Sequence, residues 1–191
     1  RAGKAYLVLG SSFGSTQVIS AADADYTFIG EAPGDYVANV GGAGDIDGDG
    51  LDDVLISARF NAEGGTKAGK VYLFLGKSLT SPGAVDLGNA DYTFVGETEG
   101  DELGGSFSRA GDMDGDGRED IVISAWRSDE ATYNGGKIYV ILNSSLGTPG
   151  KFDLANADFT YSDAMHTYLA DSMAAAGDVN GDGLDDLLLG E

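Results

Sequence analysis

Three Asp-rich loops carry the residue types best suited to chemistry in this 191-residue chain. Each has the same nine-residue pattern: DIDGDGLDD at 45–53, DMDGDGRED at 112–120 and DVNGDGLDD at 178–186. Side-chain oxygens fall at loop positions 1, 3, 5 and 9, and the residue at position 7 would add its backbone carbonyl. The candidate ligands are Asp45, Asp47, Asp49, Leu51, Asp53, Asp112, Asp114, Asp116, Arg118, Asp120, Asp178, Asn180, Asp182, Leu184 and Asp186.

Crowded carboxylates in these loops call for a bound cation. A glycine stands at position 6, where the chain must turn sharply: Gly50, Gly117 and Gly183. Each like-charged pair costs about 1–4 kcal/mol at such short range, and a hard divalent cation with six or more oxygen ligands removes that repulsion. Eleven of the twelve side-chain ligands are Asp, which disfavours soft transition metals. Magnesium demands a tighter octahedron and retains its waters, so the loops predict three Ca²⁺ sites.

Two other interpretations of the loops fit the sequence less well. Solvated Asp-Gly turns are common singly, but a full ligand pattern that occurs three times in register is not expected from turns alone. An EF-hand or dockerin-type loop needs a bidentate Glu at position 12 and a flanking helix. Position 12 is instead Ile56, Ile123 or Leu189, inside apolar β-like runs, so Asp at position 9 is expected to close the loop.

Internal repeats place these loops on a regular scaffold. GKAYLVLG (3–10) returns at 69–76 and 136–142, and ADYTFIGE (24–31) returns at 90–97 and 157–163, always after 66 or 67 residues. The apolar runs are short and rich in β-branched and aromatic residues without polar alternation, which predicts strands buried on both faces. In one unit we expect strands near 36–44, 53–58, 69–76 and 90–97. Repeat register also favours strand over helix for 164–176.

The repeats predict one all-β domain over 1–191, built of four-stranded antiparallel β-propeller blades of about 66 residues. About three blades are expected: a half-blade at 1–35, full units at 36–102 and 103–168, and a half-blade at 169–191. Because three blades are too few to close a ring, we expect either a head-to-tail homodimer with six blades or the remaining blades of a longer chain.

Composition limits the partners and the chemistry. The chain has 32 Asp and Glu against 11 Lys and Arg, a net charge of −21, which disfavours nucleic acid and anionic membrane surfaces. It has no cysteine and no apolar run of 18 or more residues, so neither thiolate chemistry nor membrane insertion is expected. The single histidine, His166, has no recognisable nucleophile partner, and we expect no enzyme activity. Arg59-Phe60 and Trp126-Arg127 follow strand ends and suit blade-edge capping better than ligand binding.

These motifs resemble the FG-GAP repeat of integrin α-subunit β-propellers and related bacterial propellers. That pattern runs Phe-Gly, small residues, Ala-Gly-Asp, a Ca²⁺ loop, an apolar strand and Gly-Ala-Pro. Leu103-Gly104, Ser106 and Ala110-Gly111-Asp112 match it best, whereas Tyr36-Val37 stands at the Phe-Gly position of another unit and Ser57-Ala58-Arg59 at a Gly-Ala-Pro position. The resemblance implies that each Ca²⁺ loop joins the first two strands of a blade and that the metal is structural.

The resemblance further implies an extracellular or cell-surface binding or adhesion module whose protein or glycan ligand is not specified by the sequence. Two alternatives remain open at this point. The chain would otherwise be a non-catalytic propeller attached to a hydrolase or lipase, or a structural or engineered propeller fragment without a ligand.

Overall fold

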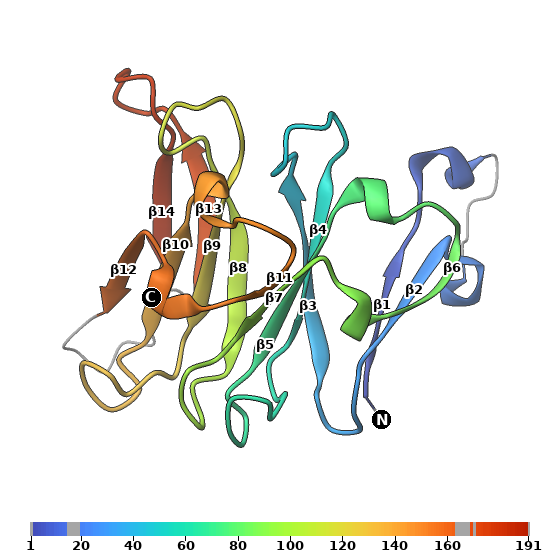
Figure 1. Cartoon of the computed structure of the whole chain (residues 1–191), viewed down its shortest axis with the longest axis horizontal. Coiled ribbons are helices and arrows are strands. Elements are labelled where there is room, and N and C mark those ends of the chain that lie inside the picture. The colour runs from blue at the N-terminus through green and yellow to red at the C-terminus, as the bar shows by residue number, and fades with distance from the viewer. Residues whose placement is uncertain (1, 15–19, 163–168, 170, 191) are drawn as a thin grey trace.

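A computed structural model describes residues 2–14, 20–162, 169 and 171–190. The fold is all-β, as predicted (Figure 1). Within the described residues, the only helices are short 3-10 turns, and none is long and apolar enough to cross a membrane. These turns are η1 (Gly10–Phe13), η2 (Ala21–Asp23), η3 (Gly76–Ser78), η4 (Leu87–Asn89), η5 (Asn143–Ser145) and η6 (Leu154–Asn156).

Two sheets form the centre of the molecule and lie side by side (Figure 1), each with four antiparallel strands from one repeat; a short parallel strand from the next repeat extends the first to five. They confirm the predicted strands and the sheet of four strands for each full repeat. The first contains β3 (Val37–Gly44), β4 (Asp53–Ala58), β5 (Lys70–Phe74) and β7 (Tyr92–Val95). The second contains β8 (Leu103–Gly111), β9 (Asp120–Ala125), β10 (Lys137–Ile141) and β12 (Phe159–Ser162).

A smaller sheet flanks each side of this centre. On one side, β1 (Lys4–Leu7) pairs with β2 (Tyr26–Ile29), in the repeat positions of β5 and β7. On the other side, β13 (Ser172–Gly177) pairs with β14 (Asp186–Gly190), in the positions of β3 and β4. Strand β13 confirms the strand interpretation of 164–176 for residues 172–176. Residues 163–168 and 170, and His166 with them, lie outside the described part of the chain.

Two short parallel strands, which sequence reasoning missed, each extend a sheet with a strand from the next repeat. β6 (Gly83–Asp86) pairs with β2, and β11 (Gly150–Phe152) pairs with β7. Each belongs to the connection between the third and fourth strands of one repeat, yet it extends the sheet of the preceding repeat. The outer strand of a sheet is therefore covered by the next repeat along the chain, which protects an otherwise open edge.

The core lies between the sheets, because the inner strands are apolar on both faces. All five residues of β5 and all six of β9 are buried. One cluster, including Leu55, Leu73 and Ile123, fills the space between the two four-stranded sheets. Smaller clusters join β1 and β2 to the first sheet and β13 and β14 to the second. The expectation of strands buried on both faces is thus confirmed for the inner strands.

Polar clamps also connect neighbouring repeats. Lys70 Nζ lies 3.0 Å from Glu31 Oε2, and the Tyr72 hydroxyl donates to the same oxygen at 2.9 Å. One repeat later, Lys137 and Tyr139 contact Glu97 at 2.9 and 2.5 Å. Each clamp joins the third strand of one repeat to the acidic residue after the fourth strand of the preceding repeat. We call these the Lys-Tyr-Glu clamps.

Candidate metal centres

Each Asp-rich loop connects the first two strands of a repeat. The first loop joins β3 to β4, the second joins β8 to β9 and the third joins β13 to β14. These strand pairs are antiparallel, so each loop is the turn of a hairpin. The position-6 glycines have φ angles of 89°, 87° and 92° at Gly50, Gly117 and Gly183. This left-handed conformation explains why glycine is required there.

The Asp at position 1 organises each loop. Asp45 Oδ1 accepts hydrogen bonds from the N–H groups of Gly48 at 2.9 Å and Asp49 at 3.0 Å. Its Oδ2 accepts one from Gly50 N–H at 2.9 Å. Asp112 and Asp178 accept the same three bonds at 2.7–3.1 Å. These donors, chiefly Gly183, hold the pKa of Asp178 below its usual value. The turn is therefore one motif built three times.

Carboxylates converge in the first two loops as predicted for positions 1, 3 and 5. Asp45, Asp47 and Asp49 each offer an oxygen within 4.8 Å of the others, and the equivalent residues of the second loop do the same: Asp112, Asp114 and Asp116. Two ligands on opposite sides of a Ca²⁺ ion at about 2.4 Å are about 4.8 Å apart. Each group thus fits within one coordination sphere, and its oxygen-only donor set suits a hard cation.

The Asp at position 9 ties the base of the loop. Asp53 is buried, and its carboxylate accepts Ile46 N–H at 2.9 Å and Gly76 N–H at 2.8 Å. Burial, with smaller contributions from the charges of Asp47 and Asp45, raises the pKa of Asp53 to about 6. Asp120 makes equivalent bonds to Met113 and Asn143. Neither residue belongs to the three-carboxylate groups. Each Asp53 oxygen keeps a second lone pair, whereas Asp120 Oδ1 accepts two hydrogen bonds from Asn143.

The third loop keeps the same turn with one fewer carboxylate. Asn180 replaces the position-3 Asp, and its amide donates to Asp182 at 3.0 Å. Asp186 accepts Val179 N–H at 2.9 Å, which reproduces half of the position-9 arrangement. At position 7, the N–H groups of Leu51, Arg118 and Leu184 donate to the position-5 Asp at 2.9–3.0 Å. The backbone carbonyls of these three position-7 residues remain predicted Ca²⁺ ligands.

Comparison with known proteins identifies the repeat. The family model described as the FG-GAP repeat matches residues 37–74 and 104–141, which include the first two Asp loops and the strands beside them. The chain contains FG-GAP repeats. The four-stranded sheets are therefore FG-GAP blades of the β-propeller type, as predicted from the sequence.

The relatives found among curated proteins are integrin α-subunits. The chain is 27% identical over 169 residues to integrin alpha-PS5 of Drosophila melanogaster, covering 86% of this chain and 16% of that protein. It is 29% identical over 171 residues to integrin alpha-5 of Xenopus laevis, covering 86% of this chain and 15% of that protein. The FG-GAP chain thus spans about one-sixth of the length of these relatives.

Two residues beside the FG-GAP loops were missed from the sequence. The Lys77 ammonium pairs with the Asp47 carboxylate, and this hydrogen bond raises the pKa of Lys77. In the next repeat, the Asn143 amide donates to Asp116 at 3.1 Å and Asp120 at 3.2 Å. Both residues lie in the 3-10 turn after the third strand. Lys77 lies three residues after β5 and Asn143 two residues after β10, so they occupy adjacent, not equivalent, positions of the repeat, and the repeat pattern alone gave no signal for either.

The two cation–aromatic pairs at strand ends make local contacts. The Arg59 guanidinium lies 5.0 Å from the Tyr36 ring centroid and 5.1 Å from that of Phe60. Arg127 lies 4.9 Å from the Trp126 ring and forms an ion pair with Glu102 at 3.2 Å. At these distances each guanidinium is attracted by the face of the ring. Edge capping by these residues stays a prediction.

Proposed function

We propose that this chain is a calcium-binding FG-GAP propeller module in which structural Ca²⁺ occupies all three DxDxDGxxD-type loops. The observation that carries the proposal is the convergence of three carboxylates within one coordination sphere, repeated in two loops. The hydrogen-bonded turn of the third loop is the same. A divalent cation would neutralise acids that otherwise repel one another.

The loop residues have distinct proposed roles. Asp45, Asp112 and Asp178 would bind the ion while their backbone hydrogen bonds hold the turn. Positions 3 and 5 supply further side-chain oxygens, and position 7 supplies a carbonyl. The position-9 carboxylate anchors the next strand, and Asp53 would reach the ion through the lone pairs that its two backbone hydrogen bonds leave free. Asp120 would do so through Oδ2, because its Oδ1 already accepts two hydrogen bonds from Asn143. The set is Asp45, Asp47, Asp49, Leu51, Asp53, Asp112, Asp114, Asp116, Arg118, Asp120, Asp178, Asn180, Asp182, Leu184 and Asp186.

We further propose a non-enzymatic role as an extracellular or cell-surface binding scaffold for a protein or glycan. The similarity to integrin α-subunits supports this role, and the net charge of −21 makes nucleic acid an unsuitable ligand. The repeats would form a single domain divided near 1–35, 36–102, 103–168 and 169–191. Attachment to a hydrolase or lipase, or a ligand-free structural role, are the competing functions.

Calorimetric titration of the EGTA-treated chain tests the calcium proposal. We expect about three Ca²⁺ ions per chain, with dissociation constants on the order of 10⁻⁴–10⁻³ M and no equivalent binding of Mg²⁺. A chain that binds no Ca²⁺ would contradict the proposal.

A panel of glycans and extracellular proteins, assayed with Ca²⁺ and with EGTA, tests the scaffold role separately. Specific retention of one panel member would support it. Intact Ca²⁺ binding without any ligand would instead favour the purely structural role.

A further inference from the structure

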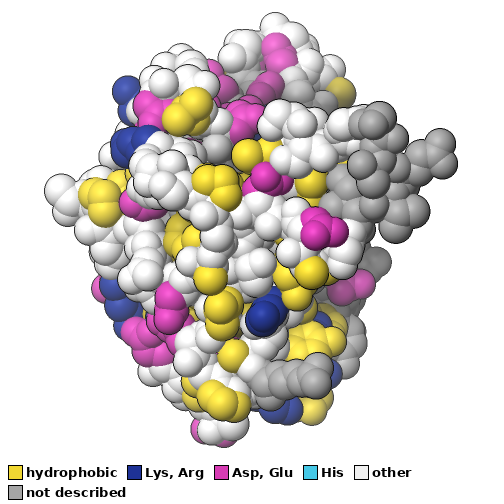
Figure 2. Space-filling model, turned by 90° about the vertical axis from the view of Figure 1, so that its right-hand side faces the viewer, with side chains coloured by type: hydrophobic (Ala, Val, Ile, Leu, Met, Phe, Trp, Pro, Cys, Tyr) yellow, Lys and Arg dark blue, Asp and Glu magenta, His cyan; other side chains and the backbone are white. Residues whose placement is uncertain are grey.

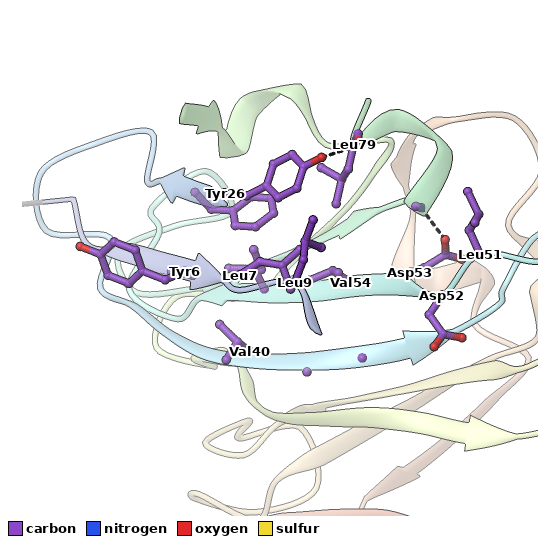
Figure 3. A pocket seen from close by; sticks show the side chains of 16 residues that line it. Tyr6, Leu7, Leu9, Tyr26, Val40, Leu51, Asp52, Asp53, Val54 and Leu79 are labelled. Carbon is purple, nitrogen blue, oxygen red and sulfur yellow. Dashed lines mark hydrogen bonds between the residues drawn. The ribbon is translucent and has the colours of Figure 1, made fainter. Parts of the chain in front are cut away.

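A groove opens between the smaller sheet of β1 and β2 and the first four-stranded sheet. It has a volume of about 630 Å³, and it is lined mainly by apolar side chains, including Leu7, Tyr26, Val40, Val54 and Ile56. Figure 3 shows the side chains of Leu7, Val40 and Val54 pointing into the space between β1, β3 and β4. Hydrophobic side chains also reach the surface on the side of the molecule that carries β1, β2 and β6 (Figure 2).

Within the described residues, one strand beside this groove and one strand on the opposite side of the molecule each have an unpaired edge. In both complete blades, the third strand lies between the second and the fourth: β5 between β4 and β7, and β10 between β9 and β12. Among the described residues, their counterpart β1 pairs only with β2. Conversely, β14 corresponds to β4 and β9 but, in the part of the chain that the structure describes, pairs only with β13. In the described residues, β1 therefore lacks a neighbouring second strand, and β14 is a second strand that lacks a neighbouring third strand.

The exposed residues of the β13–β14 hairpin are those that the complete blades bury. Leu188 is 64% exposed, whereas its repeat counterpart Leu55 is fully buried. Leu55 packs in the cluster that contains Ile121 and Ile123 of the next blade. The first-sheet counterparts of these two isoleucines are Val54 and Ile56, which line the groove. By the same packing, Leu188 from another molecule would fill it.

Contacts between successive Asp loops also occur twice, and the third is missing among the described residues. Within one copy, the Leu184 side chain packs against Gly115: a Cβ added to this glycine would lie 3.2 Å from Leu184 Cδ2. Arg118 contacts Gly48 in the same way at 3.1 Å. At the third counterpart, Gly181, no described atom lies within 4 Å of a Cβ. The residue that would contact Gly181 by repeat position is Leu51, which is 50% exposed and lines the groove.

A second set of loop contacts repeats this arrangement. Glu119 packs against Gly44, and Asp185 packs against Gly111 and accepts Asp112 N–H at 3.0 Å. The third counterpart, Gly177, has no described atom within 4 Å of a Cβ. Its expected partner by repeat position is Asp52, which also lines the groove. The same hairpin-to-hairpin contacts thus occur twice within the chain. A third set would form if the β13–β14 hairpin of another molecule packed against the groove.

We propose that the β13–β14 hairpin of a second copy of this chain docks in the groove, with β14 paired antiparallel to β1. The register follows from the β4–β5 pairing, in which Leu55 lies opposite Leu73 and Ile56 opposite Tyr72. Leu188 of one copy would accordingly lie opposite Leu7 of the other, and Leu189 opposite Tyr6. The described part of each copy has this groove at one side and the β13–β14 hairpin at the other. Two reciprocal contacts would therefore close the assembly as a head-to-tail pair with about six blades.

Disulfide trapping tests this register, because the natural chain has no cysteine. A Leu7→Cys chain is mixed with a Leu188→Cys chain under oxidising conditions. Paired strands bring Cα atoms within the range that a disulfide requires, so a covalent dimer should form between the two variants. A Tyr6→Cys chain mixed with the Leu188→Cys chain is the matched control, because adjacent strand residues point to opposite faces. Equal trapping in both mixtures would overturn the register.

Light scattering of the unmodified chain at micromolar concentration tests the assembly without any substitution. The expected mass is twice that of the 19.6 kDa chain. Leu188→Asp should halve it while the circular dichroism spectrum is retained, because Leu188 is exposed in the single copy. A monodisperse wild-type monomer would overturn the proposal and leave the groove to further blades of a longer polypeptide. Open-ended polymers would overturn closure by two copies.

Discussion

Removal of one hydroxyl from a Lys-Tyr-Glu clamp should measure how firmly neighbouring FG-GAP blades are held. Tyr72 is fully buried, and its hydroxyl donates to Glu31 Oε2 at 2.9 Å. Tyr72→Phe keeps the ring and opens no large cavity. Glu31 retains Lys70 at 3.0 Å, so the substitution removes one hydrogen bond and leaves the ion pair intact.

The expected cost follows from the acceptor. A hydrogen bond to a charged group contributes about 1.5–3 kcal/mol. Because the Glu31 side chain is 30% exposed, water competes for it, and we expect a loss near the lower end, about 1.5–2 kcal/mol. For a chain of this size, that loss lowers the melting temperature by roughly 3–8 °C.

Chemical denaturation at fixed protein and calcium concentrations measures the loss. Tyr139→Phe repeats the test in the next blade, because the Tyr139 hydroxyl donates to Glu97 at 2.5 Å. Tyr161→Phe is the control, since Tyr161 is 56% exposed and should change the free energy of unfolding by less than about 0.5 kcal/mol. If both buried variants unfold within that margin of wild type, the clamps do not stabilise the blade interface.

Two further substitutions test the electrostatics. Burial raises the pKa of Asp101 from 3.8 to about 6. The folded state therefore prefers the protonated carboxyl, and the stability associated with this proton is complete below about pH 4 and is lost as the pH rises through about 6. In denaturant titrations, Asp101→Asn should therefore be more stable than wild type near neutral pH, by at most about 3 kcal/mol, and equally stable near pH 4. Glu99→Gln, at an exposed position, is the control. A stability difference that does not change with pH would argue against burial of the Asp101 charge as its cause. The third loop carries Asn180 in place of an Asp and should bind Ca²⁺ most weakly. In calorimetry, Asp47→Asn should lower the Ca²⁺ affinity of the first loop towards that of the third. An unchanged binding isotherm would show that position 3 is not a ligand.

The sequence predicted the strands and loops because the repeat supplied independent copies of each signal. Apolar runs such as 71–75 are short and rich in β-branched and aromatic residues, which favours a strand buried on both faces. The glycines of the Asp loops likewise admit only a tight turn, and the structure confirms their left-handed conformation at Gly50, Gly117 and Gly183. The convergence of the first three acidic positions follows from that turn in the first two loops.

Contacts between repeats were less accessible to sequence reasoning. Strands β6 and β11 carry no apolar alternation, and they form because the edge of a preceding sheet offers unpaired backbone groups. The contacts of Lys77 and Asn143 with the loops depend on how a third strand ends beside a neighbouring hairpin. The buried anchoring bonds of Asp53 are similarly set by the approach of Gly76 across the sheet. Such contacts depend on tertiary packing and not on local residue pattern.

Thermal melting of the same chain in EGTA, in Mg²⁺ and in Ca²⁺ tests the central claim most directly. At a tenfold excess over the dissociation constant, each occupied site adds about 1.4 kcal/mol, and three sites add about 4 kcal/mol. The melting temperature in Ca²⁺ should therefore exceed that in EGTA by roughly 8–16 °C, with Mg²⁺ close to EGTA. Coincident melting curves in the three conditions would contradict structural calcium in the Asp loops.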